Sequence, residues 1–284
     1  MRGNRRWQLY LMSNHDRTLV QQLTEHLGMP TKVEYDEDNL IALALTEKDN
    51  SFWLAELKNF PELRRLSLTG IKGIKDVLAQ LWQLRKLKIL NIRNTDVQEL
   101  PPELGNLTHL KFLEIGDTEL RGLPSEIGLL VELEALHVYN SRLQKLPPEL
   151  GNLQQLTTLV LAGNELEELP SEIGGIEALE ELDVNNNNLQ TLPSTIGNLR
   201  RLRVLEASEN QLRELPEEVG ELQKLEMLHI NGNHLQDLPS SMIYLQSLMS
   251  IDLSKNDWKP LRLEELPLPP KLLNSIFPGK ANFI

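Results

Sequence analysis

Leucine recurs at a fixed interval along most of this chain, and that period constrains the fold more than any other feature of the sequence. It occupies equivalent positions 23 residues apart, at 87, 110, 133, 156, 179, 202, 225 and 248. From each start the pattern is L-x-x-L-x-L-x-x-N-x-L-x-x-L-P-x-x-I-G-x-L, and residues 156–176 hold the clearest copy. With 61 leucines and no long apolar run, such a repeat predicts a stack of similar units rather than one or two globular cores.

The first half of each copy predicts a short strand followed by a turn. Its later leucines alternate with other residues, so they point inward while the residues between them point outward. Stacking the copies pairs these strands into a parallel sheet with a spacing of about 4.8 Å. The asparagine at the ninth position has donors and an acceptor for the backbone of its own turn and of a neighbouring coil. Thr95, Thr118 and Ser141 replace it in the early copies, where we expect a locally different ladder that is still hydrogen-bonded.

The second half of each copy predicts a short helical turn on the opposite, convex side. A proline begins it, because the ring presets φ and the residue needs no hydrogen-bond partner for its nitrogen. The glycine four residues later is expected to end the turn, where a positive φ is tolerated. The prolines lie at 101, 124, 147, 170, 193, 216 and 239, and the glycines at 105, 128, 151, 174, 197 and 220. Ile243 replaces the last glycine and indicates a change toward a terminal cap.

These motifs resemble the leucine-rich repeat family. The Leu-Pro-x-x-Ile-Gly half is similar to that of intracellular Ras-group, plant Ras-group-related and Scribble/Erbin-type proteins, and of many bacterial repeat proteins. The resemblance implies an α/β, right-handed solenoid, or horseshoe, with a parallel concave sheet and short convex helical or 3-10 turns. About ten coils would run from Leu40 to near Trp258, roughly three quarters of the chain.

The two ends of the array are expected to be caps that cover the terminal coils. The predicted cap at the N-terminus has strands at residues 7–11 and 40–45, helices that begin near residues 13 and 51, and an acidic loop at residues 34–38. A small independent domain at the front and a partner-docking tail at the back are the alternatives. The predicted division is residues 1–62 for the βαβα cap with a degenerate first coil, 63–257 for the repeats and 258–284 for the C-terminal cap or tail.

Composition and motifs exclude several classes of function. The absence of cysteine removes disulfide scaffolds, cysteine-ligated metals and cysteine nucleophiles, including the cysteine-dependent ubiquitin ligases among bacterial repeat effectors. A net charge of −12 disfavours binding to nucleic acid or to anionic membranes. The sequence has no G-x-S-x-G elbow, Walker loop, H-E-x-x-H or kinase signature. We therefore expect a monomeric, non-enzymatic protein without cofactor or metal, and, since no targeting or membrane-spanning run is found, a cytoplasmic one.

The concave face is where we expect function, because it is the usual contact surface of solenoids. Its outward residues form three columns, and the middle one reads Ser67, Asn91, Glu114, His137, Val160, Asp183, Glu206, His229 and Asp252. Aromatic and methionine side chains displayed among polar ones are typical of protein-binding surfaces. The predicted partner-binding residues are Phe112, Glu114, His137, Tyr139, Asp183, Glu206, Met227 and His229.

Charge along the array predicts the kind of partner. Residues 61–93 contain eight Lys or Arg and two acids, whereas residues 162–235 contain fifteen acids and five bases. A partner surface facing the later coils is therefore expected to be basic. On three consecutive strands there, His229 is predicted to lie between Glu206 and Asp252, as a solvated hydrogen-bonded triplet or, alternatively, as ligands of a divalent metal.

Three functions fit these observations. The first is a protein-interaction module, and the resemblance to Ras-group repeats implies scaffolding around a small GTPase or a phosphatase. The second is a bacterial effector whose surface mimics a host scaffold. The third is a substrate-recognition subunit whose catalytic partner is a separate chain.

Overall fold

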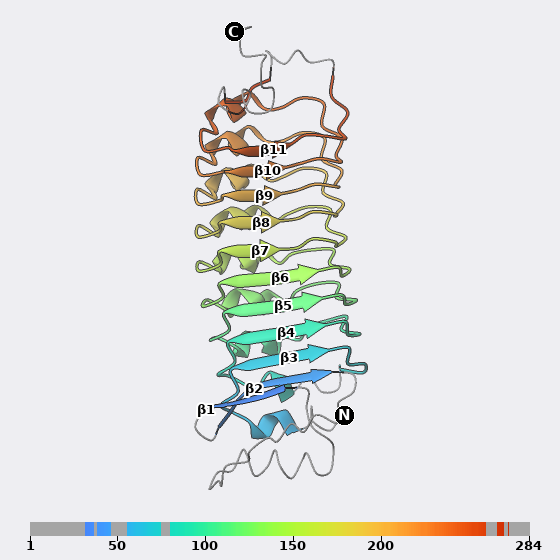
Figure 1. Cartoon of the computed structure of the whole chain (residues 1–284), viewed down its shortest axis with the longest axis vertical. Coiled ribbons are helices and arrows are strands. Elements are labelled where there is room, and N and C mark those ends of the chain that lie inside the picture. The colour runs from blue at the N-terminus through green and yellow to red at the C-terminus, as the bar shows by residue number, and fades with distance from the viewer. Residues whose placement is uncertain are drawn as a thin grey trace, which may run out of the picture.

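The chain folds into a solenoid, as predicted. The computed structural model describes residues 32–36, 39–46, 56–74, 80–259, 266–269 and 272. Successive coils stack along one long axis, with the strands on one side and short 3-10 helices on the other (Figure 1). The predicted strand at residues 7–11, the helix that begins near residue 13 and the start of the helix predicted from residue 51 lie outside the described residues. The end of that second helix is described, and Leu57–Asn59 form a 3-10 helix there.

A single sheet runs through the described coils, with its strands in sequence order. All neighbours from β2 onward are parallel, and only β1 pairs antiparallel, with β2. The strands are β1 (Lys32–Asp36), β2 (Asn39–Thr46), β3 (Arg65–Thr69), β4 (Ile89–Arg93), β5 (Phe112–Gly116), β6 (Ala135–Tyr139), β7 (Thr158–Val160), β8 (Glu181–Asp183), β9 (Val204–Glu206), β10 (Met227–His229) and β11 (Ser250–Asp252).

Strand β1 corrects the prediction of an acidic loop at residues 34–38. Val33 and Tyr35 alternate with charged residues and pack, partly buried, against the core. Glu34 between them forms an ion pair with Arg65 of β3 (2.7 Å). The charge run hid a period-two pattern, which is the stronger indicator of a strand. The strand predicted at residues 40–45 is confirmed within β2.

One continuous core fills the space between the sheet and the 3-10 helices. The inward leucines of adjacent strands, such as Leu136, Leu159 and Leu182, are completely buried. Burial stabilises the fold by about 1.5–3 kcal/mol for each such side chain. The apolar interior of one coil is too thin to be buried by that coil alone, so the neighbouring coils must cover it.

On the helical side of the solenoid, the prolines of the repeat mark where the 3-10 helices begin. Its 3-10 helices are η1 (Leu57–Asn59), η2 (Pro102–Asn106), η3 (Ser125–Leu129), η4 (Pro148–Asn152), η5 (Ser171–Gly175), η6 (Ser194–Asn198), η7 (Glu217–Glu221) and η8 (Ser240–Tyr244). From η2 to η8, a proline in extended conformation directly precedes the first helical residue, as Pro170 does with φ −64° and ψ 147°. The prolines therefore start these turns, as predicted.

The glycine of each turn has a different role from the one predicted. None of the six glycines from Gly105 to Gly220 in this column has a positive φ. Positive φ occurs instead one residue before the ladder position, for example at Asn186 (φ 53°). A Cβ added to Gly174 would lie 2.4 Å from the carbonyl oxygen of Thr195 in the next coil. Close approach between coils, rather than backbone freedom, requires glycine here.

The predicted asparagine ladder is confirmed in the later coils. Asn187 Oδ1 accepts a hydrogen bond from the backbone N–H of Leu166 in the preceding coil (3.0 Å). Its Nδ2 donates to the carbonyl oxygens of Leu161 (3.0 Å) and Val184 (3.1 Å). Asn164, Asn210, Asn233 and Asn256 repeat this arrangement. The side chain thus joins its own coil to the preceding one.

The early part of the ladder agrees only partly with the prediction. The hydroxyls of Thr118 and Ser141 are hydrogen-bonded to each other (2.9 Å), and Thr118 Oγ1 accepts from the N–H of Leu120 (3.3 Å). The expectation that all three hydroxyls are paired is wrong for Thr95. Its side chain is 4% exposed and its Oγ1 has no hydrogen-bond partner among the described residues. A hydroxyl is too short to reach the groups that asparagine reaches.

Thr95→Val is therefore expected to stabilise the protein, by about 1 kcal/mol. Valine keeps the shape of threonine and removes a buried polar atom that has no partner. The matched variant Thr118→Val removes a paired hydroxyl and should lower stability by a similar amount. Urea titration of both variants measures the two changes, and a destabilised Thr95→Val would contradict the assignment.

Candidate functional site

The outward side chains of the strands form the surface that we call the sheet face. Its three columns begin at Arg65, Ser67 and Thr69 of β3, and from β7 onward the third column lies directly after the strand. The strand pairing aligns the middle column as predicted, from Ser67 through Glu114, His137 and Asp183 to Asp252. A constant repeat length produces this register, because each strand starts at the same point of its coil.

Three rings gather on β5 and β6, and we call Phe112, His137 and Tyr139 the aromatic group. The rings of Phe112 and His137 meet edge to face, with centroids 5.0 Å apart and planes inclined by 73°. All three side chains are half-buried. Edge-to-face packing fixes the rings relative to each other, so the group offers a partner a rigid, partly apolar surface.

A buried carboxylate holds the aromatic group in place. Glu114 is 5% exposed and forms an ion pair with Arg93 of β4, while the hydroxyl of Tyr139 donates to its Oε1 (2.8 Å). The guanidinium carbon of Arg93 lies 5.9 Å from the centroid of the Tyr139 ring, within cation–π range. Gly116 makes room for that ring, since a Cβ there would lie 2.4 Å from it.

The titration behaviour of the group follows from this packing. Burial, together with the hydrogen bond to Glu114, raises the pKa of Tyr139 to about 12. Burial also lowers the pKa of His137, with the nearby Glu114 carboxylate opposing that shift. Near neutral pH the tyrosine keeps its proton and the imidazole is uncharged, so neither ring adds a charge to the ion pair between Arg93 and Glu114.

Carboxylates gather on the next part of the sheet face, and we call Glu181, Asp183 and Glu206 the acidic group. Asp183 Oδ1 accepts a hydrogen bond from the N–H of Asn185 (2.9 Å), and Asn185 Nδ2 donates to Glu206 (3.4 Å). Burial raises the pKa of Asp183, and the neighbouring carboxylates of Glu206 and Glu181 raise it further. From β7 to β11 the three columns contain no lysine or arginine.

The predicted triplet around His229 is only half formed. His229 Nδ1 contacts Glu206 Oε1 (2.9 Å), as expected. Its Nε2 lies 3.3 Å from the hydroxyl of Ser250, whereas Asp252 Oδ1 accepts from the N–H of Ser254 (2.9 Å). The backbone donor two residues along satisfies Asp252 locally, so the carboxylate does not turn toward the ring. Among the described residues no three histidine or acidic side chains are placed to hold a metal ion.

The raised pKa of Asp183 predicts a pH-dependent gain from Asp183→Asn. A carboxylate whose folded pKa lies above its unfolded value destabilises the fold once it is ionised. The variant should therefore be more stable than the parent at about pH 7, and this advantage should shrink as the pH falls toward about 4. Asn185 N–H keeps an acceptor in the variant.

Asp252→Asn is the matched control for that prediction. Asp252 accepts the same kind of backbone hydrogen bond, but this bond lowers its pKa. An ionised group with a lowered folded pKa stabilises the fold, so this variant should lose stability at about pH 7. Urea titrations across pH compare the two, and changes of the same sign would contradict both assignments.

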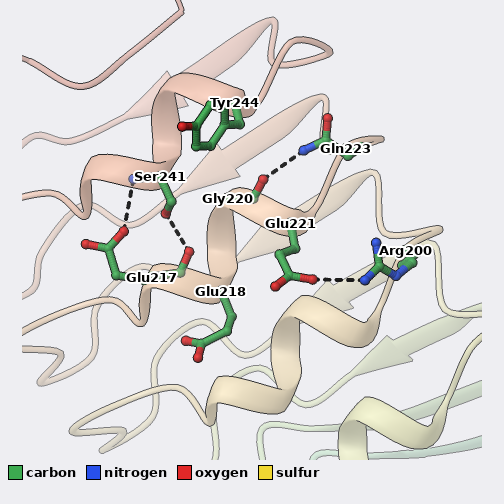
Figure 2. Close-up of a pocket in the computed structure, with 8 residues that line it drawn as sticks. All are labelled: Arg200, Glu217, Glu218, Gly220, Glu221, Gln223, Ser241 and Tyr244. Carbon is green, nitrogen blue, oxygen red and sulfur yellow. Dashed lines mark hydrogen bonds and ion pairs between the residues drawn. The ribbon is translucent and has the colours of Figure 1, made fainter.

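A cleft on the helical side is a weaker candidate. It has a volume of about 450 Å³ beside η7 and η8, and several of its polar groups, those of Arg200, Glu217, Glu221, Gln223 and Ser241, are already paired within it (Figure 2). Arg200 forms an ion pair with Glu221 (2.9 Å). The backbone N–H of Ser241 donates to Glu217 (3.0 Å) and thereby lowers its pKa.

The structure gathers the predicted site residues into two parts of one face. Phe112, Glu114, His137 and Tyr139 lie together, Asp183 and Glu206 form the acidic group with Glu181, and His229 and Met227 adjoin it on β10. Sequence reasoning missed Arg93, Gly116 and Asn185 as members of the site. Arg93 was recognisable as the only basic side chain on β4 next to the glutamate of β5.

Comparison with known proteins identifies the architecture. A family model described as a leucine-rich repeat region matches residues 42–161, 148–212 and 195–268. No curated protein sequence matches the chain. In the described part of the chain, no helix has the length and apolar character needed to cross a bilayer.

Solved structures agree with the family match. A leucine-rich repeat protein of Leptospira interrogans is 35% identical with a TM-score of 0.70, and the match covers 74% of this chain and 54% of that one. The ectodomain of the Arabidopsis thaliana receptor kinase GASSHO1, in complex with CASPARIAN STRIP INTEGRITY FACTOR 2, is 30% identical (TM-score 0.69, 80% and 29%). The Arabidopsis receptor kinase HAESA, in complex with the peptide hormone IDA and the co-receptor SERK1, is 25% identical (TM-score 0.66, 80% and 40%).

The matched regions thus span about half or less of the length of these proteins. The family model itself covers residues 42–268 in overlapping segments, which is well over half of this chain. This protein belongs to the leucine-rich repeat family.

Proposed function

We propose that this chain is a non-enzymatic interaction module that binds a protein or peptide partner on its sheet face. The observation that carries the proposal is the aromatic group, which is half-exposed and held rigid by the buried Glu114 and its ion pair with Arg93. Rigid aromatic side chains lose little conformational entropy when they bind, and they are enriched among residues that dominate interface energies. Two receptors of similar fold support this class of partner. HAESA has been solved with the peptide hormone IDA, and the plant peptide hormone receptor RGFR1 has been solved with RGF2.

The experiment that tests this function compares the two faces of the solenoid. The double variant Phe112→Ala, Tyr139→Ala removes two rings of the aromatic group. The control Leu129→Ser, Val131→Ser changes two apolar side chains of the helical side that are 55% and 56% exposed. Partners captured from a cell extract by the parent chain should be lost with the first variant and kept with the second, while thermal unfolding shows that both are folded. Capture that depends only on the helical-side residues would refute the proposal.

The charge of the sheet face refines the partner. The acidic group and Asp252 lie on strands whose columns contain no lysine or arginine, so a basic partner surface is favoured toward the later coils. We further propose that the chain acts alone as a monomeric scaffold in cytoplasmic signalling. Partner capture in living cells, followed by size-exclusion chromatography, tests both parts.

A second candidate is a bacterial protein that acts on a host cell. The similarity to the Leptospira interrogans protein favours it. A reporter fused to the full chain distinguishes the two, because only an effector would be delivered into host cells during infection.

The ends of the chain are proposed to act as caps, with residues 1–62 in front and 258–284 behind. Leu268 and Leu272 are each 2% exposed and belong to the same core as the repeats, which supports the C-terminal cap. β1 supports the N-terminal one, since it covers the edge of β2.

A further inference from the structure

Several charged side chains of the array form ion pairs with the next coil, but the two carboxylates that β8 displays on the sheet face do not. Lys111 pairs with Glu134 (2.6 Å), Arg203 with Glu226 (2.9 Å) and Arg200 with Glu221 (2.9 Å), each across one coil boundary. In the described part of the chain, Glu181 and Asp183 lie within ion-pair distance of no basic side chain. The half-buried Asp183 is also close to the Glu206 carboxylate, so its charge is poorly compensated within the chain itself.

One strand, β7, separates the aromatic group from the acidic group, and the side chains that it displays are short. β7 displays Thr158 and Val160, followed by Ala162, all of them small side chains. His137, which borders β7 on one side, has a buried Nε2 without a hydrogen-bond partner among the described residues. A polar group left unpaired in this way costs stability until a partner satisfies it. Because the side chains of β7 are short, a segment that crosses β6 and β7 would lie close to the sheet. It would contact the aromatic group at one end and the acidic group at the other, and these two groups are its anchors.

The spacing of the anchors sets the spacing of the side chains that would fit them. Phe112 on β5 and Glu181 of the acidic group on β8 lie in the same column, three strand steps apart. At about 4.8 Å per step this is about 14 Å. An extended chain advances about 3.4 Å per residue, so side chains about four positions apart span the same distance.

We propose that the sheet face binds an extended basic segment of a partner protein, which places an apolar side chain on Phe112 and an arginine or lysine on Glu181 and its neighbour Asp183, four residues apart. The charge complementarity of the acidic group selects the cation, and the aromatic group selects the apolar residue. This inference rests on the proposed function and adds the chemistry and the spacing of the ligand.

Selection from a random nonapeptide library displayed on phage, with the full chain as bait, tests the motif. Enriched peptides should carry an apolar and a basic residue four positions apart. A synthetic peptide of the selected sequence should bind at least tenfold more weakly to Glu181→Gln, Asp183→Asn and to Phe112→Ala. The control Glu167→Gln, Glu168→Gln makes the same charge change on exposed residues between β7 and η5, and it should bind like the parent. Raising the salt concentration should weaken binding to the parent chain.

The outcomes separate this inference from the function on which it rests. Selected peptides without a basic residue, or with an affinity that the acidic-group variant leaves unchanged, would overturn the inference. If Phe112→Ala still abolished their binding, the proposed function would stand. Peptides insensitive to every sheet-face variant would overturn both. A library without enriched peptides would also overturn the inference, and the partner capture described above would then decide the proposed function by itself.

Discussion

Replacing Gly174 with alanine is expected to lower the free energy of unfolding by about 3 kcal/mol. The new Cβ would lie 2.4 Å from the carbonyl oxygen of Thr195 and 2.7 Å from its Cβ, so two coils would have to separate. The backbone of Thr195 is fixed by its own 3-10 helix and cannot yield as the end of a long side chain would. Separation of these coils opens the core between them, because each coil covers the core layer of the next.

The sign of this effect distinguishes close approach from helix propensity. Alanine is the better helix former, so an alanine without steric conflict would be neutral or stabilising. Gly122→Ala is the matched control, since no atom lies within 4 Å of its new Cβ and its φ is not positive. It should change stability by no more than about 0.5 kcal/mol. Urea titration of the two variants gives both values, and a Gly174→Ala protein as stable as its parent would show that the coils are not in contact there.

Replacing Asn187 with alanine is expected to cost about 3 kcal/mol as well. The change leaves the buried N–H of Leu166 without its acceptor and takes a donor from the carbonyl oxygens of Leu161 and Val184. An unsatisfied buried amide costs about 1–3 kcal/mol, and the small cavity left by the amide group adds to this. Because Asn187 joins two coils, local opening around it should also increase hydrogen exchange at Leu166.

The neighbouring residue provides the control for that effect. Asn188 makes an exposed hydrogen bond to Gln211 (3.3 Å), and Asn188→Ala removes the same atoms from the same asparagine run. Its cost should stay within about 0.5 kcal/mol. Equal losses from the two variants would mean that the ladder adds nothing beyond a surface hydrogen bond.

Much of the sheet face could be predicted because it repeats. Glu206 and His229 lie one repeat length apart in the sequence, so the repeat period alone predicted that they are neighbours on β9 and β10. The same counting placed Asp252 next to His229, yet its carboxylate binds a backbone N–H of its own strand end. A column predicts which residues are neighbours, whereas the rotamer and the nearest donor determine which neighbour each side chain contacts.

The pair at the centre of the site was harder to predict for a related reason. Arg93 and Glu114 lie in different columns and meet diagonally across β4 and β5. Diagonal contacts depend on side-chain length and on the twist of the strands, neither of which a column shows. The role of Gly116 is likewise visible only when the Tyr139 ring that covers it is in place.

The sequence by itself determined the coil, the parallel sheet of the repeats, the register of the columns and the position of the turns that follow the prolines, because a constant period places equivalent residues at equal heights. Only the tertiary structure decided why glycine stands in the 3-10 helices, which hydroxyl of the early ladder stays unpaired, and which charges on the sheet face lack a counterion. The physical reason is that these properties belong to contacts between coils, over distances of a few ångströms. The period of the leucines repeats from coil to coil, but the side chains that meet across each boundary do not.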